Sequence, residues 1–275
     1  MSRAHIPILL YHSVCADPPA WIAPFTVTPE TFNRHLELVV ASGRQALGIS
    51  EFVERITDPA PGEPFEHPPV VITFDDGFAD FVTHAGPMMA ARHLPSTLYV
   101  STGSLRASPG RTPYAPTETV LPLAEMMRWD DLVEAESYGA EIGAHSHTHP
   151  QLDLLTADEA REEIRTSRDS LEQALGHRVR SFAYPHGHST PRVRSIVANL
   201  GFDSGAGVRN RFSSAIDDPF NIARLTVRAD TSDATLAAWL DGRSAPGASL
   251  LEAPKSMLGR TVRRMSPRRA YPASV

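Results

Sequence analysis

Short apolar runs alternate with helical segments along most of this 275-residue chain, and this alternation limits the possible folds more than any other feature. Each run is rich in apolar or β-branched residues and leads into a polar or glycine-bearing loop, as buried strands do. Strands that alternate with helices form βαβ units, so the pattern predicts an α/β fold around a mostly parallel sheet. The expected strands are Ile6–His12, Val70–Phe74, Ser96–Val100, Glu141–His145, Ser181–Tyr184 and Ala223–Val227.

Two of the segments between these runs carry helix signals. The first, Thr31–Ser42, follows a proline-containing start signal and places its apolar residues on one face. The second, Thr156–Leu175, opens with a capping box formed by Thr156 and Glu159, and Gly176 follows as a stop. Both segments are therefore predicted to be helices that pack on the sheet.

The length of the chain suits one large domain, because an α/β barrel commonly has this size. We expect residues 1–245 to form this domain. Beyond Pro246 the pattern decays into a basic tail, residues 246–275, which we expect to be flexible and solvated. The alternative for this tail is attachment to an anionic membrane surface or to a partner.

Composition and charge argue against several classes of protein. A net charge of -6 gives no general attraction to nucleic acid or to an anionic membrane. The lone Cys15 excludes an internal disulfide. The apolar stretch Ile6–Tyr11 is too short for a secretory signal or a transmembrane segment, so we expect a cytoplasmic protein. The oligomeric state cannot be inferred.

Three histidines, His145, His147 and His149, directly follow one of the expected strands. In α/β folds, active sites collect at the carboxyl ends of parallel strands. Two imidazoles four residues apart can converge on one cation if the chain turns, and imidazole suits zinc and other late divalent metals. The alternative is a histidine-rich surface loop.

Two carboxylates, Asp75 and Asp76, follow the apolar run Val70–Phe74 and precede Gly77. Neighbouring side chains at a strand end point in different directions, so one carboxylate can bind a metal while the other faces water. Taken alone, this segment is equally consistent with an ordinary turn. Combined with two imidazoles, it makes a three-ligand site with an open position, which is typical of catalytic metals. The two elements together predict a hydrolase in which the second carboxylate takes a proton from water.

A third strand enters the turn Tyr184-Pro185-His186-Gly187. Proline and glycine fix a backbone shape here that could direct an amide N–H at a developing oxyanion. These residues are candidates for substrate binding, although a simple turn explains them equally well.

The three motifs, residues 73–77, 145–149 and 182–187, resemble in this order those of the polysaccharide deacetylase family, carbohydrate esterases with a NodB-like domain. The opening residues 7–14 are similar to members that begin with a Tyr-His-x-Val strand. Similarity in order and character extends over about residues 6–242. The resemblance implies a distorted (β/α) barrel of about seven strands.

The resemblance also assigns roles by motif position. Asp75 would be the general base. The metal ligands would be Asp76, His145 and His149, with Zn²⁺ expected and Co²⁺, Ni²⁺ or Mn²⁺ as alternatives. The backbone N–H of His186 would help to hold the oxyanion.

The sequence departs from the family pattern in two places. Ala183 occupies the position of an arginine that orients the base in many members, and we hypothesise that Arg224 supplies this charge from a neighbouring strand. The late histidine that protonates the leaving amine is also absent, since no histidine follows His188. The candidates for this acid are His12, His186 and His188, with His12 first because it ends an expected strand.

The expected function is removal of an N-acyl group, acetyl in the first instance, from an amino sugar, a glycan precursor or an oligosaccharide. Alternatives are a metal-dependent amidase acting on a cyclic imide or an acylated metabolite, and a non-catalytic sugar-binding module. Trp21, Tyr114 and Trp129 could form a sugar platform, or could equally belong to the core or to loop packing.

Overall fold

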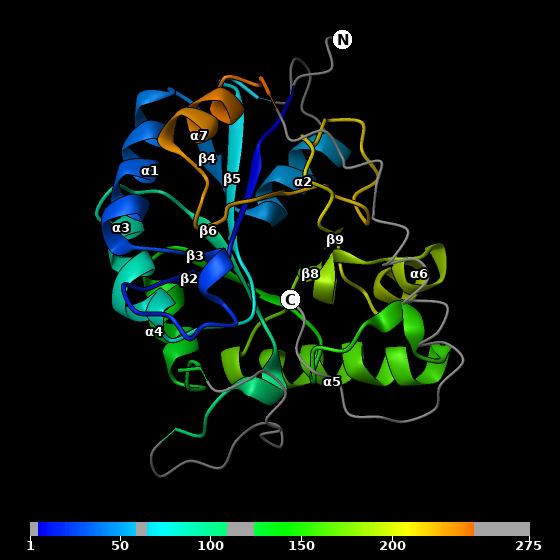
Figure 1. The fold of residues 1–275 in the computed structure, drawn as a ribbon. Helices are drawn as coiled ribbons and strands as arrows, with labels where there is room; N and C mark the ends of the chain where they lie inside the picture. The colour runs from blue at the N-terminus through cyan, green and yellow to red at the C-terminus, as the bar shows by residue number, and fades with distance from the viewer. Residues whose placement is uncertain (1–4, 59–64, 109–123, 245–275) are drawn as a thin grey trace.

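A curled sheet of parallel strands forms the centre of the molecule, with helices packed around it (Figure 1). The computed structural model describes residues 5–58, 65–108 and 124–244. Within these residues the sheet runs in the order β10-β1-β5-β6-β7-β8-β9, and β4 pairs with β5 beside this path. An isolated parallel bridge joins Ala206 of β9 to Ile222, in the segment that leads into β10. The expected distorted (β/α) barrel of about seven strands is therefore confirmed.

The bounds of the elements are as follows. The strands of the sheet are β1 (Ile8–Tyr11), β4 (Gln45–Leu47), β5 (Pro69–Phe74), β6 (Ser96–Val100), β7 (Ala140–Ala144), β8 (Ser181–Ala183), β9 (Ser204–Ala206) and β10 (Leu225–Thr226). A separate parallel pair is formed by β2 (Ser13–Val14) and β3 (Thr26–Val27). The α-helices are α1 (Pro29–Ala41), α2 (Ile49–Thr57), α3 (Gly86–Ala90), α4 (Asp131–Ser137), α5 (Ala157–Leu175), α6 (Pro191–Asn199) and α7 (Asp233–Leu240).

The register of the strands places the predicted motifs at one edge of the sheet. Phe74, the last residue of β5, pairs with Tyr11 of β1, and Ala144, the last residue of β7, pairs with Val100 of β6. Parallel strands in this register end side by side. The residues that follow these strand ends are His12, Asp75, Ser101 and His145.

The two helices predicted from capping signals are present. Helix α1 begins after Thr28, whose hydroxyl accepts a hydrogen bond from the backbone of Thr31. Helix α5 has the reciprocal capping box of Thr156 and Glu159, and Gly176, with φ of 77°, caps its C-terminal end. In Figure 1, α1 and α7 lie together on one side of the sheet, and α5 lies beside α6 on another.

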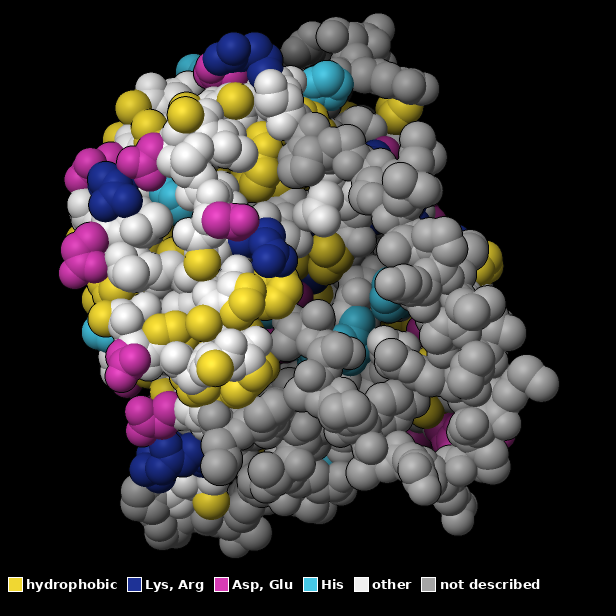
Figure 2. Space-filling view, in the orientation of Figure 1, with side chains coloured by type: hydrophobic (Ala, Val, Ile, Leu, Met, Phe, Trp, Pro, Cys, Tyr) yellow, Lys and Arg dark blue, Asp and Glu magenta, His cyan; other side chains and the backbone are white. Residues whose placement is uncertain are grey.

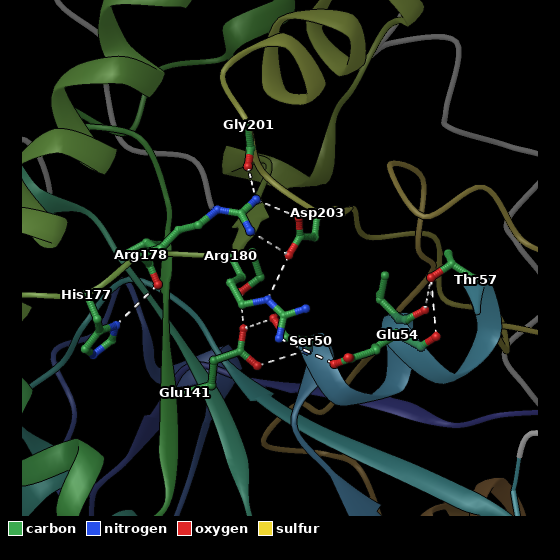
Figure 3. Close-up of polar contacts among 12 residues, drawn as sticks. Ser50, Glu54, Thr57, Glu141, His177, Arg178, Arg180, Gly201 and Asp203 are labelled. Carbon is green, nitrogen blue, oxygen red and sulfur yellow. Dashed lines mark hydrogen bonds and ion pairs between the residues drawn. The ribbon is translucent and has the colours of Figure 1, made fainter. Parts of the chain in front are cut away.

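A polar cluster joins the other ends of the strands (Figure 3). Glu141, near the start of β7, accepts hydrogen bonds from the backbone N–H and hydroxyl of Ser50 at 2.9 and 2.6 Å, and from the Ser181 hydroxyl at 2.7 Å. Arg180 pairs with Asp203 at 2.8 Å. These contacts connect α2, β7, β8 and the segment that leads into β9, at the end of the barrel away from the motifs.

Some expectations concern residues outside those described. They include the candidate Tyr114 and the basic tail 246–275. The domain boundary and the cytoplasmic location stay predictions. None of the described helices combines the length and apolar character that a bilayer-spanning helix requires.

Candidate metal centre

Asp76, His145 and His149 converge on one point at the carboxyl edge of the sheet. One ligand atom from each residue lies within 4.8 Å of the other two. Asp76 Oδ1 is 3.4 Å from His145 Nε2 and 3.2 Å from His149 Nε2. Asp76 and His145 are buried, and His149 is partly buried. Figure 2 shows histidine side chains in a hollow of the face drawn, next to apolar and arginine side chains.

The chemistry of these three side chains fits a divalent metal. Buried carboxylate oxygens normally have hydrogen-bond partners, yet within the described chain Asp76 Oδ1 has none of ordinary geometry and faces two imidazoles. His145 Nδ1 lies 2.8 Å from the Ala183 carbonyl, and donation there leaves the Nε2 lone pair facing the site. Burial by itself would raise the pKa of Asp76, but His149 and His145 hold this pKa well below its ordinary value. One oxygen and two nitrogen ligands suit zinc.

The backbone at and beside the candidate metal ligands is strained. Asp76, Ser146 and His149 have φ of 76°, 63° and 55°, in the left-handed region that residues with a Cβ rarely adopt. Gly77 has φ of 88°, and a Cβ there would lie 3.0 Å from the Val100 side chain. Strain of this kind collects at functional sites, where the surrounding contacts hold it in place.

Asp75 lies beside the three ligands and is paired with Arg224. The guanidinium donates to both carboxylate oxygens, with Nη1 2.6 Å from Oδ1 and Nη2 2.8 Å from Oδ2, and both side chains are buried. Arg224 also donates to the Gly207 carbonyl and the Thr73 hydroxyl. Burial would raise the pKa of Asp75, but Arg224, with smaller contributions from His145 and His12, outweighs this effect and lowers the pKa below its ordinary value. The contact that the Arg224 hypothesis requires is thus present, while its catalytic importance stays a prediction.

Two of the candidate acids lie close to the ligands. His12 follows β1, whose Tyr11 carbonyl accepts the backbone N–H of Asp75 at 3.0 Å. Burial lowers the pKa of His12, although Asp76 and Asp75 oppose this shift. The ring of His186 lies 4.6 Å from that of His149, and burial together with His149 lowers the pKa of His186 to about 3. His188 follows the same turn and is partly buried.

The third motif forms one tight turn after β8. His186 has φ of 58° within Pro185–Gly187, and a Cβ on Gly187 would overlap with Val208. The Tyr184 side chain is fully buried and its hydroxyl donates to the Phe220 carbonyl at 2.9 Å. The backbone of Tyr184 is also engaged, since its N–H donates to the Ala206 carbonyl at 2.9 Å and its carbonyl accepts the Gly187 N–H at 2.8 Å. A substrate contact by Tyr184 stays a prediction from the sequence.

Several contacts around the site carried no signal in the sequence. His147 turns away from the ligand group, and its Nδ1 lies 2.9 Å from the Thr102 hydroxyl. Glu163 of α5 accepts hydrogen bonds from the backbone of His147 and Thr148. Neither Thr102 nor Glu163 belongs to a motif that could have identified it. A contact between distant segments of the chain leaves no local pattern.

The structure leaves fewer aromatic candidates for a sugar contact than the sequence does. Trp129 is 3% exposed and belongs to the main hydrophobic core, so packing explains it. Trp21 is partly buried, with its ring centroid 6.0 Å from that of Phe78, two residues after Asp76. Trp21 therefore remains the described candidate for a sugar contact.

Comparisons with known proteins agree with this geometry. A sequence model of the polysaccharide deacetylase family matches residues 62–205, which contain all three motifs. The Bacillus subtilis (strain 168) protein YxkH, named as a polysaccharide deacetylase whose activity is still to be verified, is 22% identical over 239 residues, which cover 86% of this chain and 77% of YxkH. The solved structure of the Streptococcus pyogenes deacetylase PplD in complex with acetate has a TM-score of 0.73 at 23% identity, covering 87% of this chain and 99% of PplD. IcaB from Ammonifex degensii has a TM-score of 0.70 at 23% identity, covering 86% and 97%. At these identities the two structures support the fold alone.

Proposed function

We propose that this chain, which belongs to the polysaccharide deacetylase family, removes an N-acyl group, acetyl in the first instance, from an amino sugar, a glycan precursor or an oligosaccharide. The observation that supports this proposal is the convergence of Asp76, His145 and His149 beside a second carboxylate that Arg224 holds in place. A site that only binds sugar has no need of this second carboxylate.

In the proposed site, Asp76, His145 and His149 hold a divalent metal, zinc in the first instance. When bound, the metal supplies a Lewis acid that polarises the acyl carbonyl and makes water more acidic. Three protein ligands are the number typical of catalytic zinc sites, and a metal held by these residues would have a further position for water or substrate. These side chains fix where the acyl group must lie.

Asp75 acts as the general base in this proposal. It is ionised at neutral pH, because Arg224 keeps its pKa low, and it accepts a proton from the water that attacks the acyl carbon. Arg224 fixes both carboxylate oxygens through two hydrogen bonds, so the orientation of the base is set before substrate binds. The backbone N–H of His186 donates to the carbonyl oxygen as negative charge develops there.

His12 is the proposed proton donor to the leaving nitrogen. Its position at the end of β1 places it within the electrostatic reach of Asp75 and Asp76. Since burial lowers its pKa, the ring is neutral at neutral pH, so it must take up a proton from solvent before it donates one to the leaving nitrogen, while Asp75 returns to solvent the proton that it accepted from water. The C–N bond then breaks, and acetate and the free amine leave.

The test is acetate release by the purified protein, loaded with Zn²⁺, from a panel of N-acetyl amino sugars and their oligosaccharides. Cyclic imides and acylated small amines are included, because Ala183 in place of the family arginine keeps the amidase alternative open. His145→Ala should lose both metal and activity, whereas Asp75→Asn should lose activity and keep metal. His12→Gln should behave like Asp75→Asn.

Release of product from imides or small amides, with none from sugars, would replace the proposal by the amidase alternative. Absence of turnover on every substrate, with metal bound, would favour a sugar-binding module. Activity retained in Asp75→Asn would contradict the assignment of the base.

A further inference from the structure

The loop that carries both histidine ligands has an unusual backbone. It runs from His145 to His149 and contains two residues, Ser146 and His149, in the left-handed region. Both ligand imidazoles depend on this conformation, because it turns the chain so that two side chains four residues apart reach one point. Side chains outside the loop must therefore hold it in place.

Glu163 of α5 holds the backbone N–H groups of this loop. Its Oε2 accepts hydrogen bonds from the backbone of His147 at 3.0 Å and of Thr148 at 2.8 Å. Its Oε1 accepts the Thr148 hydroxyl at 2.6 Å. The two N–H groups lie between the left-handed residues, and successive N–H groups in such turns form a concave site for an anion. In this protein the Glu163 carboxylate occupies that concave site.

The remaining polar groups of the loop are held from another direction. Thr102 and Gly103, which follow β6, donate backbone hydrogen bonds to the carbonyls of Ser146 and His147 at 3.3 and 2.8 Å. The Ser146 hydroxyl accepts the backbone N–H of His149 at 3.1 Å. The loop is thus held from two directions. Backbone N–H groups after β6 donate to its carbonyls, and the Glu163 carboxylate accepts from its N–H groups.

We propose that Glu163 is a positioning residue for the metal centre, which sets the distance between His145 and His149 without binding the metal itself. Both of its oxygens are directed at loop donors, and it is not among the converging ligands. Metal–nitrogen bonds of about 2.0–2.1 Å tolerate little displacement of an imidazole. Groups that orient ligands from behind typically change metal affinity by about 10–100-fold when they are removed. This inference rests on the proposed function, since it assumes a metal at Asp76, His145 and His149.

The experiment measures Zn²⁺ affinity by competition with a chromophoric chelator. We expect Glu163→Ala to weaken Zn²⁺ binding by about 10–100-fold. Glu163→Gln should stay close to the original protein, because its carbonyl oxygen accepts the N–H groups and its amide donates to the Thr148 hydroxyl. If Glu163→Ala does not fold, Glu163→Asp replaces it, since its carboxylate is one methylene too short to keep all three contacts.

Glu141→Ala is the matched control. Glu141 also accepts three hydrogen bonds, but at the opposite end of the same strand β7. We expect this variant to lower the melting temperature and to leave Zn²⁺ affinity within about twofold of the original.

The outcomes separate the two proposals. If the original protein binds no Zn²⁺, the proposed function fails and this inference falls with it. If the original binds Zn²⁺ and Glu163→Ala binds it equally well, the role of Glu163 alone is refuted. Equal loss in Glu163→Gln would mean that charge rather than position matters, and equal loss in Glu141→Ala would mean general destabilisation. Either result would overturn the proposal.

Discussion

Replacing Arg224 with methionine should cost both stability and activity, because the substitution leaves the Asp75 carboxylate buried without a counter-charge. In the structure Arg224 is fully buried and donates to both oxygens of Asp75, at 2.6 and 2.8 Å. Removing one partner of a buried ion pair typically destabilises a protein by about 3–5 kcal/mol. Methionine fills enough of the arginine volume that an unfilled cavity adds little to this loss. We therefore expect the free energy of unfolding, measured in urea, to fall by about this amount.

The same variant should change the pH dependence of the reaction. Burial raises the pKa of Asp75, and Arg224 is the main group that lowers it again. Without Arg224 the carboxylate binds its proton at higher pH, so the acidic limb of the pH–rate profile should move upwards and turnover at neutral pH should fall.

A double-mutant cycle with Asp75→Asn provides the control. If Arg224 and Asp75 stabilise the protein through their mutual contact, the double variant should be more stable than the sum of the two single losses predicts. The interaction free energy from the cycle should be about 1–3 kcal/mol. Additive losses, or an acidic limb that does not move in Arg224→Met, would refute this reasoning. Unchanged turnover in Arg224→Met would also reject the role assigned to Arg224.

Three further predictions follow from other contacts. Burial lowers the pKa of His35 from its ordinary 6.5 to about 4 in spite of Asp233, so folding favours the neutral ring. This difference in pKa contributes about 3 kcal/mol to the free energy of unfolding, which should be fully present above pH 6.5 and lost as pH falls towards 4. Urea unfolding of His35→Gln should lack this pH-dependent contribution, and an identical pH dependence in both proteins would contradict it. Gly187→Ala should destabilise by about 1–3 kcal/mol, since its φ is 71° and the new Cβ overlaps with Val208. Gly176→Ala, with φ of 77° but a new Cβ that meets no described residue within 4 Å, should lose less, and equal losses in urea would argue against the overlap. Dialysis against a chelator should abolish acetate release and added Zn²⁺ should restore it, whereas full activity in a metal-free sample would refute the metal requirement.

The parts of the fold that could be predicted are those with local signals. The run Val70–Phe74 differs from β5 by one residue, because a strand buried on both faces is apolar throughout. Helix α5 was predicted from its capping box, which is a contact between residues three positions apart. Strand β9 was missed, since Ser-Gly-Ala contains no strand-forming side chain. It exists because its neighbours require small residues, and a Cβ on Gly205 would overlap with the Tyr184 hydroxyl.

The candidate site likewise contains residues with a local sequence signal and residues without one. The three converging ligands could be predicted because they stand in two compact motifs, each directly after a strand. The contact between Asp75 and Arg224 joins residues 149 positions apart, and the sequence supported it only as a hypothesis drawn from a missing arginine. Glu163 stands among other acidic residues of an amphipathic helix, so its contact with the loop became visible only in three dimensions.

The charges at the site explain why we propose different roles for the two adjacent carboxylates. Arg224 occupies both oxygens of Asp75, which neutralises this side chain and leaves no lone pair in the direction of the guanidinium. Asp76 receives no such cation, and its Oδ1 faces only the imidazoles of His145 and His149 within the described residues. A buried negative charge of this kind is costly unless a positive charge balances it. The proposed division of the pair into base and ligand therefore follows from which carboxylate Arg224 can reach, and in this proposal a cation beside Asp76 would complete the balance.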